Sequence, residues 1–426
     1  MAVTILFAVF LLLLALGVPV AFALIAASLA TVIYLDLPAI VVVQQTVAGA
    51  GSASLLAIPL FVFAGELMMR GGISDRLIAL ASSMVGHLRG GLGQINVVAS
   101  LLFGGVSGSA IADVSAVGGT MIPQMIKRGF DRDFAVNVSI TAALVALLVP
   151  PSHNLILFSA SAGGSISIAD LFAAGLLPAL LMMAVLMVTT RILAVRRGYA
   201  AEPFPGFGAV LRRLVAALPG LALVALIFVG IRAGIFTAIE SAAIAVAYAL
   251  LVSIAVYRRM SLAGFVEAAT GAARTAGLIL FVIGAAASFG WLLAFLQVPG
   301  AAVDALRAVS DEKVVILLLM VVALLVMGTF MDLAPLIIIC TPIFLPVARA
   351  YGVDPVHFGV ILILTAGVGL ITPPVGSVLF VGAAIGRISV TETLRSIWPF
   401  YIAALLVVLT VVFVPQLSLW LPQAIK

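Results

Sequence analysis

The sequence has 426 residues, of which 65% are hydrophobic and only 9% are charged, and its mean hydropathy is +1.37. Soluble domains are about half apolar and about one quarter charged, so this composition excludes a water-soluble globular fold. A membrane helix needs about 20 apolar residues, and the chain has room for roughly ten to twelve of them. Long apolar runs such as residues 2–32 lack the alternation of barrel strands, which leaves an all-α polytopic membrane protein.

Apolar stretches in chain order predict membrane helices near residues 2–34, 40–69, 170–195, 211–231, 235–257, 276–297 and 396–414. The segments 74–88 and 261–274 combine periodic apolar residues with charged ones, a pattern typical of amphipathic helices at the membrane interface. The first apolar stretch is too long for a cleavable signal peptide and lacks a basic leader, so it is expected to be a true first helix. The single cysteine, Cys340, lies in an apolar helix and forms no intrachain disulfide.

The distribution of basic residues predicts the orientation of the chain. Suppose that the N-terminus is cytoplasmic, and that segments 92–128 and 313–350 each enter and leave the membrane on one side. Sixteen of the 21 lysines and arginines then lie on the cytoplasmic side. This bias follows the positive-inside rule and supports both re-entrant segments. It also accounts for the net charge of +5 without a nucleic-acid partner.

Two interrupted segments of the chain resemble each other, which predicts an internal repeat. Each contains a turn of small residues that leads to an aspartate, then a proline ten residues later and, further on, a diproline. The matched pairs are Asp113 with Asp332, Pro123 with Pro342, and Pro150–Pro151 with Pro373–Pro374. The helix at 211–231 carries the chain across the membrane between the copies, so the second copy is expected to be inverted. Inverted repeats with discontinuous helices are typical of secondary transporters, whose site lies near the midplane.

The expected organisation therefore has three parts. Residues 1–197 form the first repeat, 198–234 form a connecting segment with the odd helix, and 235–426 form the second repeat. Within the repeats we expect re-entrant hairpins at 92–128 and 313–350 and broken helices at 134–164 and 356–387.

The hairpin tips and the helix breaks are candidate cation sites. Small and hydroxyl residues at 107–109 and 328–329 turn the backbone sharply, and such backbone survives at membrane depth only when it is buried in protein or lines a cavity. An ordinary helical turn with small packing residues is the alternative. The diprolines remove backbone donors and break their helices. The carbonyl groups freed in this way, which are expected to bind a cation, belong to Leu148, Val149, Ile371 and Thr372.

Several polar residues beside the breaks and tips are candidates for substrate contact or for shaping the tips. The half-helices that begin near Ser152 and Val375 present N-terminal N–H groups to an anion. Asn154 and Ser377 are matched polar residues just past the breaks. His153 is expected to be a pore or packing residue.

Asp113 and Asp332 are expected near the two tips. A carboxylate at membrane depth costs about 2.5–3.5 kcal/mol on insertion scales and usually has a function. Two functions remain open for them, capping of the second hairpin arm and direct ion coupling. No nucleotide-binding loop of the GxxxxGK[ST] type is present, so ATP does not drive this chain directly, and we expect a transporter rather than an enzyme.

Three motif stretches resemble the large membrane subunit of tripartite ATP-independent periplasmic (TRAP) transporters, in the ion transporter superfamily. They are GGVSGSAIADVSAVGGTMIPQMIKRGFDRDFA (104–135), MDLAPLIIICTPIFLPVARAYGVDPVHFGVI (331–361) and ITPPVG (371–376). The resemblance runs essentially from end to end. It implies an elevator mechanism, in which hairpins and broken helices slide against a scaffold. It also implies sodium coupling, a separate four-helix membrane subunit and a periplasmic binding protein that delivers a carboxylate such as a C4-dicarboxylate, sialic acid, keto acid or sugar acid.

The resemblance also assigns two sodium sites. The first would involve Ser107, Ser109 and the carbonyl groups of Leu148, Val149 and Pro150. The second would involve Gly328, Thr329 and the carbonyl groups of Ile371, Thr372 and Pro373. Two alternatives remain: a stand-alone sodium–dicarboxylate symporter that needs no binding protein, and a passive channel or membrane scaffold.

Overall fold

The computed structural model describes residues 1–51 and 53–425, without the side chains of residues 53, 54, 106 and 107. The described residues form helices and no strand, as expected for an all-α membrane protein. Six helices are long and apolar enough to cross a membrane, and up to nine spans result if each of three bent helix pairs in the described part is one span. The chain is therefore a multi-pass membrane protein.

The helices of the first half of the chain are α1 (Ala2–Ala15), α2 (Val20–Tyr34), α3 (Ile40–Ala50), η1 (Ala53–Leu56), α4 (Ala57–Arg70), α5 (Ile73–Val85), α6 (Gly91–Ser107), α7 (Ala110–Asp113), η2 (Val114–Gly118), α8 (Gly119–Lys127), α9 (Arg132–Ala146), α10 (His153–Ser161) and α11 (Ile168–Arg196). Those of the second half are α12 (Phe207–Arg232), α13 (Ala238–Leu251), η3 (Val252–Val256), α14 (Leu262–Phe295), α15 (Val298–Arg307), α16 (Lys313–Phe330), α17 (Leu333–Ala350), α18 (Pro355–Gly369), α19 (Ser377–Gly386), α20 (Val390–Ser396), α21 (Trp398–Phe413) and α22 (Gln416–Ala424). The elements η2 and η3 are single π-helical turns.

The prediction of one helix over residues 2–34 is wrong. The structure has two short helices, α1 and α2, which fold back and pack against each other. Gly17 between them has a φ of +79°, which glycine adopts without strain. Pro19 follows and lacks the N–H that a continuous helix would need. Similarly, the helix predicted at 40–69 is divided into α3, η1 and α4.

The prediction of a separate interfacial helix at 261–274 is also wrong. Residues Leu262–Phe295 form one uninterrupted helix, α14, of 34 residues. At a rise of 1.5 Å per residue this helix is about 51 Å long. No proline lies within it, so the charged first turns continue directly into the apolar part. The amphipathic helix predicted at 74–88 does form, as α5, and packs against α6 and α12.

Each segment that was predicted as a hairpin or as a broken helix consists of helical parts on either side of an interruption. The first hairpin consists of α6 and, after a tip at Gly108 and Ser109, of α7, η2 and α8. The second consists of α16 and α17 with its tip at Met331 and Asp332. The broken helices are α9 with α10 and α18 with α19, and each break contains a diproline whose internal peptide bond is cis.

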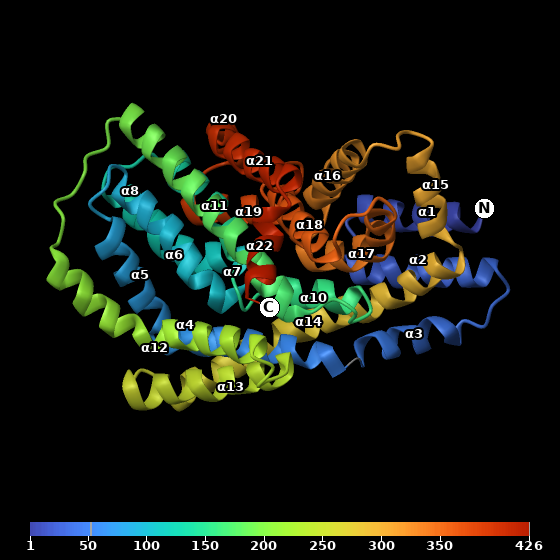
Figure 1. Cartoon of the computed structure of the whole chain (residues 1–426), viewed down its shortest axis with the longest axis horizontal. Coiled ribbons are helices and arrows are strands. Elements are labelled where there is room, and N and C mark those ends of the chain that lie inside the picture. Colours follow the sequence, from blue (N-terminus) through green and yellow to red (C-terminus); the bar gives the residue numbers. More distant parts are fainter. Residues whose placement is uncertain (52, 426) are drawn as a thin grey trace.

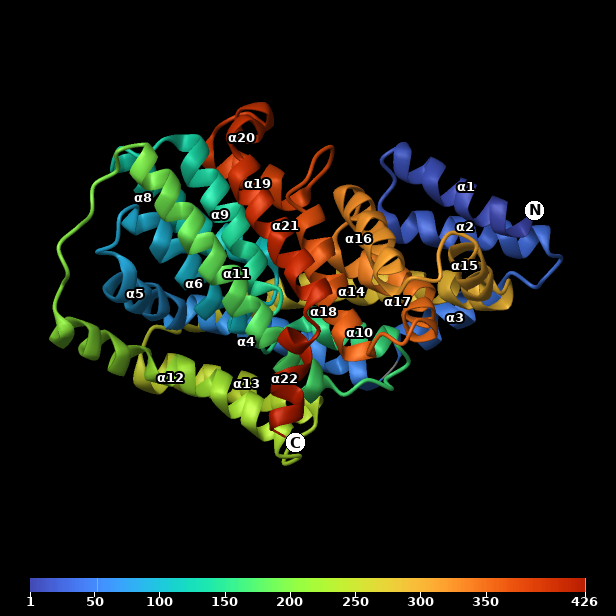
Figure 2. The ribbon, with the colours of Figure 1, turned by 45° about the horizontal axis from the view of Figure 1, so that its top comes forward.

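These motifs lie together on one side of a group of long helices. In Figure 1, α3, α4, α12, α13 and α14 run along the lower edge, and the hairpins and broken helices lie above them. The contacts agree, because α14 packs against α2, α3 and α4, and α13 packs against α4 and α12. Above them α9 packs against α6 and α19, while α18 packs against α16 and α17. Figure 2 shows α11 and α21 beside the two broken helices.

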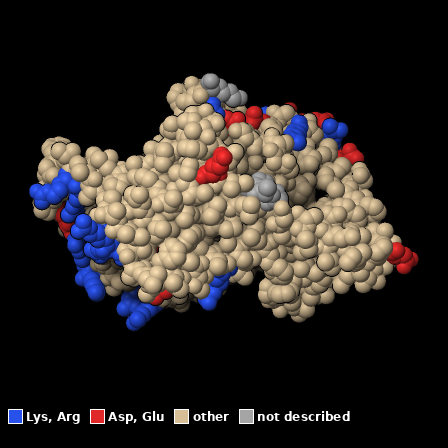
Figure 3. All heavy atoms as spheres, turned by 90° about the horizontal axis from the view of Figure 1, so that it is seen from below, with Lys and Arg blue, Asp and Glu red and all other residues tan. Residues whose placement is uncertain are grey.

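Basic side chains gather at one end of the molecule. On the face that Figure 3 shows, most visible lysines and arginines lie toward the end that carries α5, α8 and the start of α12 in Figure 1. Arg212 near the start of α12 is exposed. Basic side chains are thus unevenly distributed along the molecule on this face.

Candidate functional site

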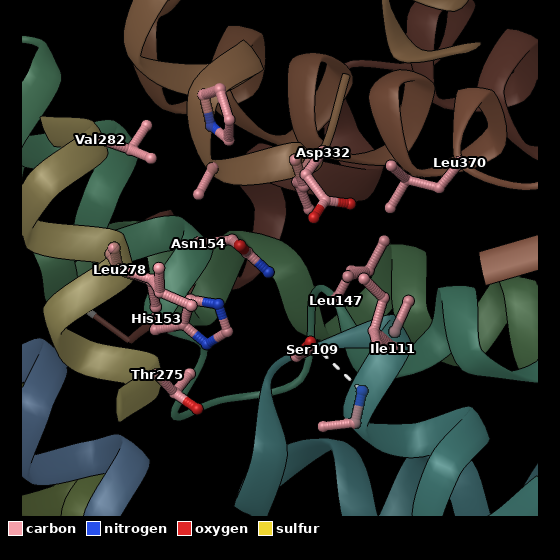
Figure 4. A pocket seen from close by; sticks show the side chains of 16 residues that line it. Ser109, Ile111, Leu147, His153, Asn154, Thr275, Leu278, Val282, Asp332 and Leu370 are labelled. Atoms are coloured by element: carbon pink, nitrogen blue, oxygen red, sulfur yellow. Dashed lines mark hydrogen bonds between the residues drawn. The ribbon is translucent and has the colours of Figure 1, made fainter. Parts of the chain in front are cut away.

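A cavity of about 440 Å³ lies between the two hairpin tips and α14. Figure 4 shows side chains from both hairpins, from both helix breaks and from α14 around it. Its polar side chains are those of Ser109, His153, Asn154, Thr275 and Asp332. The remaining lining is apolar, and none of the described residues that line it is lysine or arginine. An anion in this cavity would therefore depend on N–H groups, neutral side chains or bound cations for its charge balance.

The first tip is fastened to the half-helix that follows its own break. Asn154, in the first turn of α10, donates a hydrogen bond of 2.6 Å from Nδ2 to the carbonyl oxygen of Gly108. Ser109 caps α7, since its Oγ accepts a hydrogen bond from the N–H of Ala112. Ser107 ends α6, and its side chain lies outside the described residues. Asn154 thus contributes to the cavity wall and also holds the first tip in place.

The second tip is fastened to its own break in a comparable way. Ser377, the first residue of α19, donates a hydrogen bond of 2.6 Å to Oδ1 of Asp332. The N–H of Gly376 donates one of 3.0 Å to the carbonyl oxygen of Thr329. The hydroxyl of Thr329 donates to Val326 in its own helix, at 2.8 Å. Asn154 and Ser377 were predicted to contact substrate. In the structure each makes a hydrogen bond to the tip of the hairpin that precedes it in the chain.

The predicted match between Asp113 and Asp332 is wrong. Asp332 is the N-cap residue of α17 and its carboxylate lines the cavity, although it makes no capping hydrogen bond. Asp113 ends α7 inside the first hairpin, is fully buried, and accepts a hydrogen bond of 2.7 Å from Ser100. The residue that takes the place of Asp332 in the first tip is Ser109, the N-cap of α7. The interval in the sequence from Ser109 to Asp332 is the same as the interval between the two diprolines.

Each helix break exposes carbonyl groups that have no hydrogen-bond donor among the described residues. In the first break the carbonyl of Leu147 accepts from Ser152, but no donor is found for residues 148–150. In the second, the carbonyl of Leu370 accepts from the N–H of Val378, but none is found for residues 371–373. Buried backbone carbonyl groups are nearly always paired with a donor, water or a ligand. Within the described residues, these two groups of carbonyls are therefore available to accept a hydrogen bond or to bind a cation.

The carbonyl groups of the first break do not all face the first tip. A Cβ atom on Gly105 would lie 2.7 Å from the carbonyl oxygen of Pro150, so this carbonyl does lie against α6 near the tip. A Cβ atom on Gly175 of α11 would lie only 2.4 Å from the carbonyl oxygen of Leu148. Leu148 therefore faces α11, which differs from its predicted role as a ligand beside the tip. Ser152 is fully buried and braces the break rather than lining the cavity.

The two breaks differ in their exposure. Pro150 and Pro151 are buried, whereas Pro373, Pro374 and Val375 are exposed, the last at 46% of its surface. The second break is therefore open on its outer side within this chain, while the first is enclosed by α6 and α11.

Sequence reasoning missed part of the cavity wall. The helix α14 contributes Thr275, Leu278, Ile279 and Val282, which share one helical face because they are three and four residues apart. His153, predicted to be a packing or pore residue, lines this cavity and an adjoining one of about 120 Å³. The spacing on α14 is visible in the sequence, but nothing there distinguishes a cavity face from any other apolar helix face. No group of three His, Cys, Asp or Glu residues in the described part could hold a metal ion.

Comparisons with known proteins agree with this architecture. A family model described as "Tripartite ATP-independent periplasmic transporter, DctM component" matches residues 7–417. The 2,3-diketo-L-gulonate TRAP transporter large permease protein YiaN of Escherichia coli (strain K12) is 35% identical over 404 residues, which cover 95% of each protein. The sialic acid TRAP transporter large permease protein SiaM of Vibrio cholerae serotype O1 is 36% identical over 408 residues, which cover 96% of this chain and 95% of that protein.

The fold is shared with a solved transporter. The crystal structure of the Alcanivorax borkumensis YdaH transporter superposes with a TM-score of 0.64 and 16% sequence identity, over 89% of this chain and 88% of that chain. Members of the matched family are permease subunits rather than enzymes. The family match over nearly the whole length and the similarity to these two large permeases show that this chain belongs to the DctM component family of TRAP transporters, the large permease subunits of bacterial multi-pass membrane transporters.

Proposed function

We propose that the chain carries a small organic acid across the bacterial inner membrane by sodium-coupled symport, with the acid bound in the cavity between the hairpin tips. The observation that carries the proposal is the convergence of both tips and both breaks on one cavity. Because no described lysine or arginine lines it, a carboxylate there would be neutralised by cations bound at the breaks. This arrangement supports the proposed coupling of cation and anion binding.

Sodium would bind at the carbonyl groups that lack donors. In the first break the carbonyl group that lies beside the tip is that of Pro150, and the carbonyl group of Val149 precedes it in the chain. The hydroxyl of Ser109, together with Ser107, would supply further oxygen ligands near the first tip. In the second, the carbonyls of residues 371–373 lie near Gly328 and Thr329, since Gly376 is bonded to Thr329. Carbonyl and hydroxyl oxygens in unwound segments are the ligands that secondary transporters use for sodium.

The chain is proposed to consist of two inverted repeats that move as an elevator. Support comes from packing as well as spacing. A Cβ atom on Gly104 would lie 2.6 Å from Cα of Ala146, and one on Gly328 would lie 3.0 Å from Cα of Gly369. The interval from Ala146 to Gly369 equals that between the diprolines, whereas the interval from Gly104 to Gly328 is longer by one position. The first tip is thus one residue longer than the second, whereas the pair Ser109 and Asp332 and the two diprolines keep one interval.

The proposed partners are a separate small membrane subunit and a periplasmic binding protein that delivers the substrate, and the proposed orientation has the N-terminus in the cytoplasm. Relatives are named for 2,3-diketo-L-gulonate and for sialic acid, both carboxylates. The substrate class proposed here is therefore a small carboxylate, which also includes dicarboxylates.

The test is uptake into proteoliposomes that hold this chain and its small subunit, with candidate binding proteins loaded with carboxylates outside. Uptake that needs both a sodium gradient and a binding protein is the expected result. Uptake driven by sodium alone would favour the stand-alone symporter, and uptake indifferent to sodium would refute the coupling. In the same assay, Asp332→Asn and Thr329→Val should weaken the sodium dependence while the protein still inserts, and normal sodium activation in both would contradict the tip site.

A further inference from the structure

The second helix break is held by a residue of a helix outside the hairpins and broken helices. Tyr401 lies in α21, one turn after the start of that helix at Trp398. Its hydroxyl oxygen lies 2.9 Å from Oγ1 of Thr372. The ring of Trp398 packs edge-on against the Tyr401 ring, with the centroids 6.1 Å apart. Two contacts thus fix the side chain of Tyr401 against the break.

The direction of this hydrogen bond follows from the other contact of Thr372. The Thr372 hydroxyl is 2.7 Å from the carbonyl oxygen of Val368, which can only accept, so the Thr372 hydrogen is used there. Tyr401 must therefore donate its proton to Oγ1 of Thr372. A chain of donors results that runs from α21 through Thr372 to the last turn of α18.

Thr372 is the middle one of residues 371–373, for whose carbonyl groups no donor is found in the described part of the chain. Both hydrogen bonds involve its one hydroxyl oxygen, so they restrict the orientation of this short side chain and of the backbone that carries it. Gly376 continues the restraint, because its N–H donates to Thr329 at the tip and because a Cβ atom on it would lie 2.8 Å from the carbonyl oxygen of Thr372. The carbonyl groups of the break are therefore held between α21 on one side and the second tip on the other.

The first break has no counterpart of the hydrogen bond between Tyr401 and Thr372. At the interval that relates the two diprolines, Val149 takes the place of Thr372 and Pro178 takes the place of Tyr401, and neither has a hydroxyl. The first break is instead enclosed, with its diproline buried and Leu148 packed against Gly175. The exposed second break lacks that enclosure, so the hydrogen bond between Tyr401 and Thr372 is what holds it from the side of α21.

We propose that Tyr401 is a positioning residue for the second cation site: its hydroxyl orients Thr372 so that the carbonyl groups of residues 371–373 are arranged to bind sodium. The inference rests on the proposed sodium coupling. Tyr401 itself contacts neither the cation nor the substrate, and it acts through Thr372. Its removal changes sodium affinity and leaves the substrate cavity intact, because Tyr401 does not line that cavity.

The experiment compares Tyr401→Phe, Thr372→Val, Thr372→Ser and the double variant Tyr401→Phe/Thr372→Val in the proteoliposome assay. One neutral hydrogen bond corresponds to about a two- to twelvefold change in an equilibrium constant. We expect Tyr401→Phe to raise the sodium concentration for half-maximal uptake by about three- to tenfold, with an unchanged maximal rate at saturating sodium. Thr372→Ser keeps the hydroxyl and should shift the sodium response less than Thr372→Val does. The double variant should show no greater shift than Thr372→Val alone.

The matched control is Tyr351→Phe, which removes a tyrosine hydroxyl bonded to the carbonyl of Ser310, remote from the break. Sodium-dependent stabilisation against heat in detergent gives a second readout that does not require transport. A Tyr401→Phe variant with wild-type sodium response, or with only a lower maximal rate or lower stability without sodium, would overturn the positioning role and leave sodium coupling standing. A wild-type protein that responds to sodium in neither assay would overturn both.

Discussion

Replacement of Gly328 by alanine tests whether the second tip must pack closely against its broken helix. A Cβ atom at this position would lie 2.9 Å from the carbonyl oxygen of Ala366 and 3.0 Å from Cα of Gly369. Both are backbone atoms of α18, so neither can rotate away. Overpacking of this kind costs about 1–3 kcal/mol. If the strain is borne by the sodium-bound arrangement, sodium affinity falls by about 5- to 150-fold.

The assay measures how sodium activates uptake in proteoliposomes. The melting temperature in detergent shows whether each variant is folded. Gly277→Ala is the matched control, since this glycine lies in α14 and, apart from the nearby backbone of its own helix, no described atom lies within 4 Å of the position that its Cβ would take. The control should keep wild-type uptake, and a bulkier Gly328→Leu change should abolish it. Normal sodium activation in Gly328→Ala would refute the reasoning, because it would mean that the tip does not need to stay against α18 to bind the ion.

Three other substitutions test separate parts of the structure. Asn154→Leu leaves the first tip carbonyl without its donor, at a cost of about 1–3 kcal/mol, and should lower uptake about tenfold or more while the protein still inserts; unchanged uptake would contradict the fastening. Arg197→Lys removes the paired hydrogen bonds of 2.8 and 2.7 Å to Asp133 and should lower the melting temperature by about one to three degrees. Arg128→Lys, in an exposed ion pair, should change it little. Thr275→Trp should fill part of the cavity and block uptake without unfolding; full activity would place the substrate elsewhere.

The sequence alone predicts the parts of the fold that depend on local chemistry. Apolar composition requires a membrane protein, and the structure accordingly has long apolar helices. The diprolines cannot continue a helix, so both breaks appear where they were predicted. Glycine and serine mark the turn at the first tip, but the turn predicted at Gly328 and Thr329 is wrong, because both lie within α16 and the chain turns at Met331 and Asp332. These features are readable because each is imposed by the covalent structure of one or two residues, whatever surrounds them.

Where a helix begins and ends is harder to predict from apolar composition than where a diproline breaks it. The break at Gly17 and Pro19 was hidden within a long apolar stretch, and α14 continues through charged residues that indicated a boundary. Hydrophobicity indicates whether a residue lies in water or in an apolar environment, whereas the position of a helix end depends on backbone dihedral angles and capping contacts. The two signals coincide at the diprolines and diverge in these two places.

The tertiary structure decided which polar residues meet. Sequence spacing paired Asp113 with Asp332, but only packing shows that Asp113 is enclosed with Ser100 while Asp332 faces the cavity. Thr275 and Tyr401 carry no motif, and each comes to the site because a distant helix packs there. A local pattern fixes the conformation of its own backbone, whereas the partners of a side chain depend on how whole helices pack, and that is set by the complementarity of their surfaces over many residues.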